Sequence, residues 1–310
     1  MLSRRSVLWI LAVLVLIALP PVVIALKQPF YLDLARRIMI LAIAAVSLNL
    51  ILGYGGLVSF GHAAYLGIGG YAVGILAFYG FTDGWVQLAV AIAASALAAA
   101  AIGAVSIRTS GIYFIMITLA FTQMLYYLGI SLAEFGGDDG MRLKRRSQFA
   151  LVDLGDPVQF YYVALALMLL AVYLTYRIVN SRFGLVLRAA KSNEARSLAI
   201  GFSPYPYRLA AFVIAGAMCG LAGALYANHT NYITPNLMSW QQSGDLMFMV
   251  ILGGMASPSG PVLGAFALLL VEDLLSGWTE HWQVILGPLL IVSVIFFRRG
   301  LAGLFSKPDA

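Results

Sequence analysis

The sequence predicts an all-α fold, a polytopic bundle of about ten transmembrane helices, some of them broken by glycine or proline. Composition is the first indication, because 62% of the 310 residues are hydrophobic and 10% are charged, whereas soluble domains average about 25% charged residues. The second is a series of long uncharged runs, since roughly 20 apolar residues cross a bilayer as a helix. Backbone groups must be paired in lipid, so each run is expected to be helical.

The expected segments follow one another with no separable soluble domain, so residues 1–310 are predicted to form a single membrane domain. The uncharged runs place the segments at about 7–26, 34–52, 58–80, 85–107, 111–132, 158–177, 208–228, 244–257, 260–277 and 281–297. Segment 244–257 is the weakest candidate for a membrane crossing, so the number of crossings is expected to lie between eight and ten.

Positive charges at the two ends of the chain predict its orientation. Arg4 and Arg5 precede the first segment, and Arg298 and Arg299 follow the last. Because basic residues concentrate on the cytoplasmic side, both termini are expected there. The loop at about 180–207 is then cytoplasmic, and the loop at about 133–157 is extracytoplasmic. The predicted location is the cytoplasmic membrane.

Several kinds of chemistry have no support in the sequence. It contains no Gly-x-x-x-x-Gly-Lys phosphate-binding motif, and His62, His229 and His281 are too dispersed for a metal-ligand pattern. We therefore predict no catalytic residue, no metal site and no cofactor, and the chain is not expected to be an enzyme. The net charge of +6 fits orientation in membrane lipid, so no nucleic-acid partner is predicted.

Glycine clusters interrupt two of the apolar stretches. Clustered glycines break a helix and free its backbone groups, and transport proteins place such breaks along their pathways. The predicted helix-break glycines are Gly53, Gly55, Gly56, Gly253 and Gly254. Close packing between helices is the alternative explanation for glycine in a membrane segment, and it suffices for Gly67, Gly70 and Gly74.

A few polar side chains lie inside the apolar segments, where they usually face the bundle interior or a water-filled cavity. The candidates for a translocation pathway are Asn49, Ser59, His62, Thr118, Thr122 and Gln123. Thr118 and Thr122 share one helix face, but a threonine hydroxyl can also bond to its own helix backbone. Glu272 and Asp273 lie toward the outer end of the ninth segment, where they either reach water or take part in a relay.

The loop at about 180–207 contains a predicted amphipathic helix over 184–201. Its apolar Leu187, Ala190, Leu198 and Ile200 alternate with charged residues. Such a helix either lies on the anionic inner leaflet or docks into a cytosolic partner, and its pattern does not distinguish the two.

Five blocks of the sequence, at 48–71, 113–121, 136–140, 193–227 and 252–264, carry a family resemblance. They include Gly136-Gly137-Asp138-Asp139-Gly140 and the paired Gly253-Gly254. In this order and spacing they closely resemble the LivM-type permease subunit of branched-chain amino-acid ABC importers, within the broader family that includes LivH and the ribose permeases. The resemblance extends from about residue 33 to residue 299.

This resemblance implies a multi-subunit importer. Its partners would be a second, LivH-like permease subunit, two cytosolic ATP-binding subunits that hydrolyse ATP, and an extracytoplasmic substrate-binding protein. The 184–201 helix would be the coupling helix, with Arg188, Glu194, Ala195 and Gly201 at the ATPase contact. The substrates would be branched-chain or related hydrophobic amino acids. Residues 141–146, which read Met-Arg-Leu-Lys-Arg-Arg, are more basic than the family pattern.

Other functions remain open. Within the same family, the cargo would be urea, short amides or aromatic acids. A stand-alone secondary carrier or channel is the alternative of another class, although the segments lack the central carboxylates that proton- or sodium-coupled carriers use. An intramembrane enzyme or a purely structural anchor lacks any supporting cluster.

Overall fold

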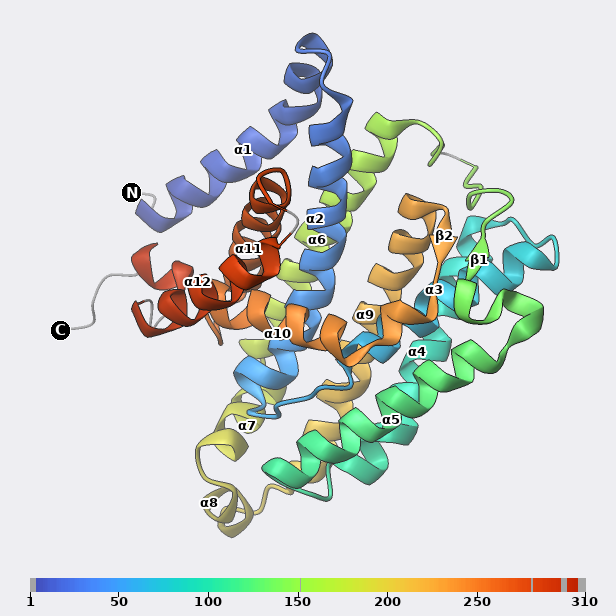
Figure 1. Cartoon of the computed structure of the whole chain (residues 1–310). Helices are drawn as coiled ribbons and strands as arrows, with labels where there is room; N and C mark the ends of the chain where they lie inside the picture. Colours follow the sequence, from blue (N-terminus) through green and yellow to red (C-terminus); the bar gives the residue numbers. More distant parts are fainter. Residues whose placement is uncertain (1–3, 151, 280, 297–299, 306–310) are drawn as a thin grey trace.

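The computed structural model describes residues 4–150, 152–279, 281–296 and 300–305, which form a helical bundle with a small two-stranded sheet (Figure 1). The helices are α1 (Arg4–Ala25), α2 (Pro29–Asn49), α3 (His62–Phe78), α4 (Gly84–Ser106), α5 (Ile112–Ser131), α6 (Pro157–Val179), α7 (Arg182–Ser192), α8 (Glu194–Ala199), α9 (Pro204–Thr230), α10 (Trp240–Gly253), α11 (Gly260–Ser276) and α12 (Trp282–Phe296). The strands are β1 (Met141–Arg142) and β2 (Tyr232–Ile233), a π-helical turn covers Leu50–Tyr54, and 3-10 turns cover Ala133–Phe135, Gly137–Asp139, Pro235–Met238 and Leu301–Phe305.

The prediction of an all-α membrane bundle is confirmed, and each expected segment overlaps one of these helices. Helices that are long and apolar enough to cross a membrane occupy Pro29–Tyr54, Gly84–Ser106, Ile112–Ser131, Pro157–Val179 and Pro204–Thr230. By contrast, α10 has 14 residues, which gives it a length of about 21 Å, against roughly 30 Å of hydrocarbon in a bilayer.

Helix α2, with the π-helical turn that extends it, forms the centre of the bundle. In Pro29–Tyr54, 94% of the most apolar 18-residue stretch is buried, whereas in α5 only 22% of the corresponding stretch is buried. Helices α6, α9, α10 and α11 all pack against α2 (Figure 1). An apolar helix surrounded in this way belongs to the protein interior, while α4 and α5 present most of their surface outward.

Small residues allow α9 to approach α3 and α4 closely. Ser95 on α4 occupies the space that a Cβ on Gly220 of α9 would need, and a Cβ on Gly69 of α3 would collide with the Gly220 carbonyl oxygen. This is the small-residue packing expected between membrane helices. Gly70, by contrast, would have ordinary contact, at 3.6 Å from the Gly223 oxygen. The close approaches of α3 to α9 are therefore at Gly69, opposite Gly220, and at Leu66, opposite Gly223.

The 133–157 loop is tied to the rest of the molecule by short strand pairings. Strands β1 and β2 are antiparallel, with Met141 opposite Ile233, and Gln148 forms bridges with Asp83 and Asp153. Gly140 precedes β1 at a φ of +76°, a conformation that glycine adopts without a steric penalty. These pairings give the loop a fixed position over the ends of α3, α4 and α9.

Candidate functional site

The first glycine cluster ends the central helix. After the π-helical turn, residues 55–61 have no regular helix until α3 begins at His62. Gly56 has a φ of +70°, and a Cβ added there would lie 2.8 Å from Cγ of Lys191. The backbone groups freed by the break find partners nearby, since the Leu57 N–H donates to the Ile51 oxygen at 3.0 Å.

The second glycine cluster lies directly against the first. Helix α10 ends at Gly253 and α11 begins at Gly260. The Asn49 side chain joins the two breaks: its Nδ2 donates to the Ser257 oxygen at 2.8 Å, and its Oδ1 accepts from the Ala256 N–H at 3.1 Å. The fold thus brings together Asn49 and both predicted breaks.

His62 is fully buried at the start of α3, beside α2. Its Nε2 lies 2.7 Å from Oγ of Ser47, whose hydroxyl donates to the Ala44 oxygen at 2.7 Å. Because that hydroxyl hydrogen is already used, the His62 Nε2–H is the donor to Ser47. Ser59 accepts from the Gly61 N–H at 3.2 Å and is also fully buried.

Thr118 and Thr122 pack against the loop that precedes α3. Their hydroxyls donate to carbonyls of their own helix, Thr118 to Phe114 at 3.0 Å and Thr122 to Thr118 at 2.9 Å. This is the backbone bonding that the sequence left open. A Cβ on Gly61 would lie 2.9 Å from the Thr118 oxygen, and the Thr122 hydroxyl lies 3.4 Å from the Phe60 oxygen, so the loop that follows Ser59 packs closely on the two threonines. Gln123 is only half-buried and follows Thr122 on α5.

The segment predicted as one helix over 184–201 is two helices, which corrects the expectation. Helix α7 ends at Ser192 and α8 begins at Glu194, because Asn193 is extended and caps α8 by accepting from the Arg196 N–H at 2.8 Å. Asparagine is among the best N-cap residues, so the chain restarts a helix at this point.

The four predicted coupling residues all lie on this segment and are exposed. Arg188 is on α7, Glu194 and Ala195 are on α8, and Gly201 follows α8 at a φ of +89°. The apolar residues divide between two environments. Leu187 and Ala190 of α7 are buried, whereas Leu198 and Ile200 are 55% and 64% exposed.

Two basic residues that sequence reasoning missed attach this segment to the bundle. Lys191 Nζ donates to the Gly53 oxygen at 2.6 Å, which connects α7 to the first helix break. Arg208 of α9 pairs with Glu194 at 2.8 Å and donates to the Ala190 oxygen at 3.3 Å. The Lys191 contact had no signal in the sequence, because its acceptor is a backbone carbonyl in a remote segment.

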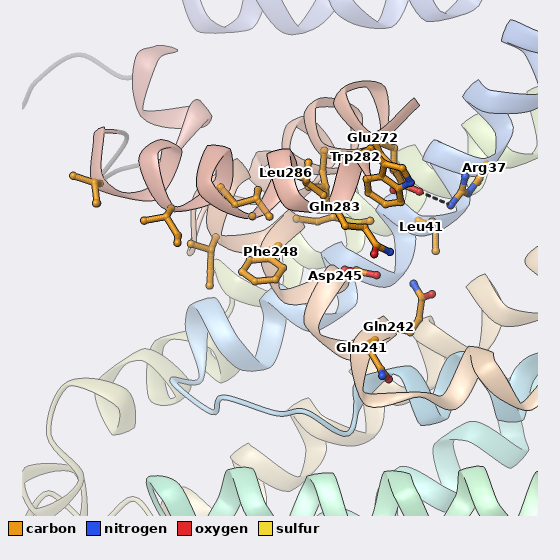
Figure 2. Close-up of a pocket in the computed structure, with 18 residues that line it drawn as sticks. Arg37, Leu41, Gln241, Gln242, Asp245, Phe248, Glu272, Trp282, Gln283 and Leu286 are labelled. Carbon is orange, nitrogen blue, oxygen red and sulfur yellow. Dashed lines mark hydrogen bonds and ion pairs between the residues drawn. The ribbon is translucent and has the colours of Figure 1, made fainter. Parts of the chain in front are cut away.

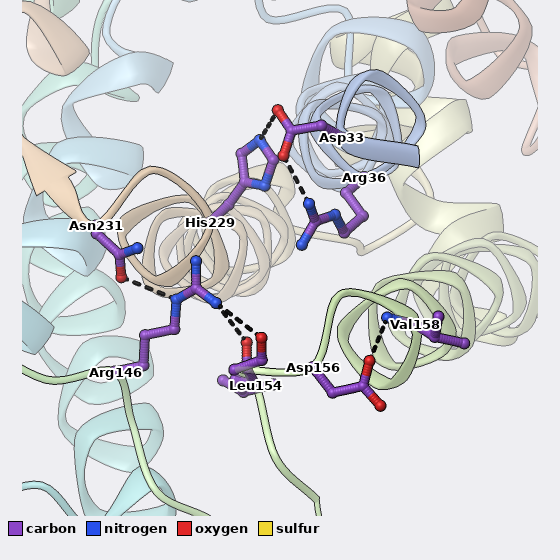
Figure 3. Close-up of polar contacts among 9 residues, drawn as sticks. Asp33, Arg36, Arg146, Leu154, Asp156, Val158, His229 and Asn231 are labelled. Atoms are coloured by element: carbon purple, nitrogen blue, oxygen red, sulfur yellow. Dashed lines mark hydrogen bonds and ion pairs between the residues drawn. The ribbon is translucent and has the colours of Figure 1, made fainter. Parts of the chain in front are cut away.

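A polar network fixes the opposite end of the bundle (Figure 3). Asp33 on α2 pairs with Arg36 at 2.6 Å, and its other oxygen lies 3.7 Å from Nε2 of His229 on α9. Arg146 donates to the Asn231 side chain at 2.9 Å and to the Leu154 oxygen at 2.9 Å. This network joins α2, α9 and the 133–157 loop.

The rest of the predicted basic cluster faces outward. Arg142, Lys144 and Arg145 are exposed, and with Arg146 they line a hollow of about 840 Å³ next to β2. Arg146 is therefore a structural residue of the loop, while the other three give this hollow a positive charge.

A cavity of about 770 Å³ lies among α2, α10, α11 and α12 (Figure 2). Arg37, Asp245 and Glu272 line it, and Arg37 pairs with Glu272 at 3.3 Å. The Glu272 side chain is 25% exposed and paired with Arg37 of α2, so it reaches water only in part. The sequence could have indicated this site through Arg37, Asp245 and Glu272, which are charged residues of opposite sign near the ends of apolar segments.

Comparison with known proteins places these features in a family. The family model of the permease component of branched-chain amino acid transport systems matches residues 30–294. The high-affinity branched-chain amino acid transport system permease protein LivM of Salmonella typhimurium is 28% identical over 308 residues, covering 90% of this chain and 72% of that protein. The LivM protein of Escherichia coli matches with the same identity and coverage.

The second permease type is also similar. The LivH protein of Escherichia coli is 23% identical over 284 residues, which cover 84% of this chain and 91% of LivH. No solved structure matches the chain. The model match covers most of the sequence, and the LivM relatives align over nearly all of it. The chain therefore belongs to the family of permease components of branched-chain amino acid transport systems.

Proposed function

We propose that this chain is one of two permease subunits in an ATP-binding-cassette importer of the bacterial or archaeal cytoplasmic membrane. A LivH-like permease subunit would complete the membrane part, two cytosolic subunits would hydrolyse ATP, and an extracytoplasmic binding protein would deliver the substrate. The cargo would be branched-chain amino acids, as the names of the relatives describe for those proteins. This chain would form part of the substrate pathway and would transmit movement from the ATP-binding subunits to the helix breaks.

One observation carries the proposal: the exposed α7–α8 segment is bonded to the broken end of the central helix. Lys191 holds the Gly53 oxygen, and Asn49 then connects this break to the one between α10 and α11. A partner that pushes on α8 would therefore move both breaks together. Such displacement of packed elements is how transporters alternate access to a site.

The fold supports ten crossings with both termini on the cytoplasmic side. Strand β2 lies at the end of the bundle that carries the Asp33 network, while Ser257 contacts Asn49 at the other end of α2. Contacts at these two ends support a crossing between residues 233 and 257, although α10 alone is short. Gly300 lies against Gly254, which puts the start of the C-terminal turn at the end that also holds α7.

The positively charged hollow supports an extracytoplasmic docking site. Arg142, Lys144 and Arg145 lie on a loop that strand pairing holds in place. Acidic side chains on a binding protein would be attracted to this surface, and such attraction raises association rates and fixes orientation.

Reconstitution tests the proposal. The complete transporter is placed in proteoliposomes with its binding protein outside and ATP inside, and uptake of tritiated L-leucine is measured. A matched transporter carries ATP-binding subunits whose phosphate-binding lysines are replaced by alanine. We expect accumulation only with intact ATP-binding subunits, because the chain has no phosphate-binding motif.

The competing functions predict different results. A stand-alone carrier would accumulate leucine with the inactive ATP-binding subunits, which would refute the proposed mechanism. Competition by isoleucine and valine is expected. If urea or short amides compete instead, the cargo is wrong and the ATP-driven mechanism stands.

A further inference from the structure

The cavity among α2, α10, α11 and α12 contains charges that its own residues do not balance. One guanidinium, that of Arg37, faces two carboxylates, those of Asp245 and Glu272. Within the described part of the chain, the Asp245 carboxylate has no hydrogen bond or ion pair, and Asp245 is exposed. The Arg37 side chain is 41% exposed, and its Nη2 donates to Glu272. The cavity therefore presents one positive and two negative accessible charges, an excess of one negative charge.

The apolar lining of the cavity lies about one helical turn from these charged residues. Each charged residue has an apolar lining residue four positions away on the same helix, in the direction of the helix breaks: Leu41, Met249 and Leu268. Residues four apart share a helix face and are separated by about one turn, roughly 5 Å. Helix α12 repeats the pattern, with Trp282 and Gln283 beside the charges and Leu286 one turn on. Figure 2 shows the charged side chains at one end, with Phe248 and Leu286 extending away.

We infer that this cavity binds a zwitterionic amino acid with an aliphatic side chain. Its ammonium group lies at Asp245 and Glu272, its carboxylate accepts from the exposed part of the Arg37 guanidinium and from the Gln283 amide, and its side chain enters the apolar layer one turn deeper. A volume of about 770 Å³ is within the range of roughly 300–1,000 Å³ for small-molecule sites. The identity of the ligand rests on the proposed function, whereas the charge pattern comes from the cavity itself.

Direct binding tests this assignment without the binding protein. The complete transporter is placed in lipid nanodiscs, and equilibrium binding of tritiated L-leucine is measured with leucinol and isocaproate as competitors. Leucinol retains the ammonium group but has no carboxylate, and isocaproate has the carboxylate but no ammonium group. Each competitor therefore probes one half of the charge pattern.

Each variant has a distinct expected effect. Asp245→Asn should weaken binding of leucine and leucinol by roughly 10- to 100-fold, the effect of a lost charge-assisted bond, and should not weaken binding of isocaproate. Arg37→Gln should weaken leucine and isocaproate but not leucinol. Asp273→Asn is the matched control, because Asp273 adjoins Glu272 on α11 but does not line the cavity.

Three results would overturn the assignment. The first is the absence of saturable leucine binding to the wild-type transporter. The second is equal weakening of all three ligands by both variants, which would indicate a structural role. The third is that the Asp245→Asn and Arg37→Gln transporters bind leucine as wild type does but no longer retain the second permease subunit, which would make the cavity a subunit interface. ATP-driven leucine uptake by the same wild-type preparation reports separately on the proposed function.

Discussion

Single side chains connect parts of this molecule that are far apart in the sequence. Asn49 holds the loop between α10 and α11 through a donor and an acceptor, and Lys191 holds the Gly53 carbonyl from another helix. Both side chains satisfy backbone groups that a helix break or a loop has freed. Irregular backbone in the membrane requires such partners, so these two residues stabilise the breaks.

The Asn49→Leu variant is expected to destabilise the protein. Leucine has a similar size but offers no hydrogen bond, so the Ala256 N–H and the Ser257 oxygen lose their partner. A fully buried polar group left unsatisfied costs about 1–3 kcal/mol, and the loss at these two part-buried bonds is expected at the lower end of that range. The single cysteine, Cys219, is buried, and a thiol-reactive fluorescent dye therefore reports unfolding on heating.

Asn180→Leu is the control for that experiment. Its side chain donates to the Tyr176 oxygen at an exposed position, where water can replace the lost bond. Unfolding temperatures that fall equally in the two variants would show that the bridge between the breaks contributes no special stability.

At the scale of helices, small residues decide which surfaces meet. Helix α9 lies against α3 and α4 because Gly69, Gly220 and Gly223 leave room for backbone contact, and a Cβ on Gly223 would collide with the Leu66 oxygen. Membrane helices have little hydrophobic drive to associate, so close packing supplies the attraction. A methyl group at these positions would force the helices apart.

Gly69→Ala and Gly244→Ala make the same chemical change in opposite environments. At Gly69 the added methyl meets backbone of α9, whereas nothing lies within 4 Å of the methyl position at Gly244. Overpacking costs about 1–3 kcal/mol, while alanine in place of an unconstrained helical glycine stabilises by up to about 1 kcal/mol. The Cys219 melting assay should give opposite shifts, and shifts of the same sign would contradict the packing account.

Apolar segments were predictable from the sequence because an uncharged run of sufficient length forms a helix in lipid. Their expected bounds are close to those of α1–α6 and α9–α12. The break between α7 and α8 depends on one capping side chain, that of Asn193, which an amphipathic pattern does not reveal. The contacts of Lys191 and Asn49 depend on backbone groups brought close by folding, so the sequence could suggest these residues only as polar or charged.

On the scale of the whole molecule, one chain of contacts leads from the exposed coupling segment to the cavity. Lys191 of α7 donates to the Gly53 oxygen just beyond the end of α2. Asn49 of α2 donates to the Ser257 oxygen in the loop before α11. Residues of α10 and α11 in turn line the cavity. This continuity is what a conduit moved by an external motor requires. Rigid helices joined at breaks can transmit displacement without any catalytic group in the chain.

The measurement that tests this coupling most directly is the amount of leucine imported per ATP hydrolysed by the reconstituted transporter. In Lys191→Met, ATP hydrolysis should continue while import per ATP falls by roughly tenfold or more, because a charge-assisted bond of about 1.5–3 kcal/mol is lost. Lys191→Arg should retain most of the coupling, and Arg182→Met, at the exposed start of α7, should match wild type. An unchanged ratio in Lys191→Met would contradict the account.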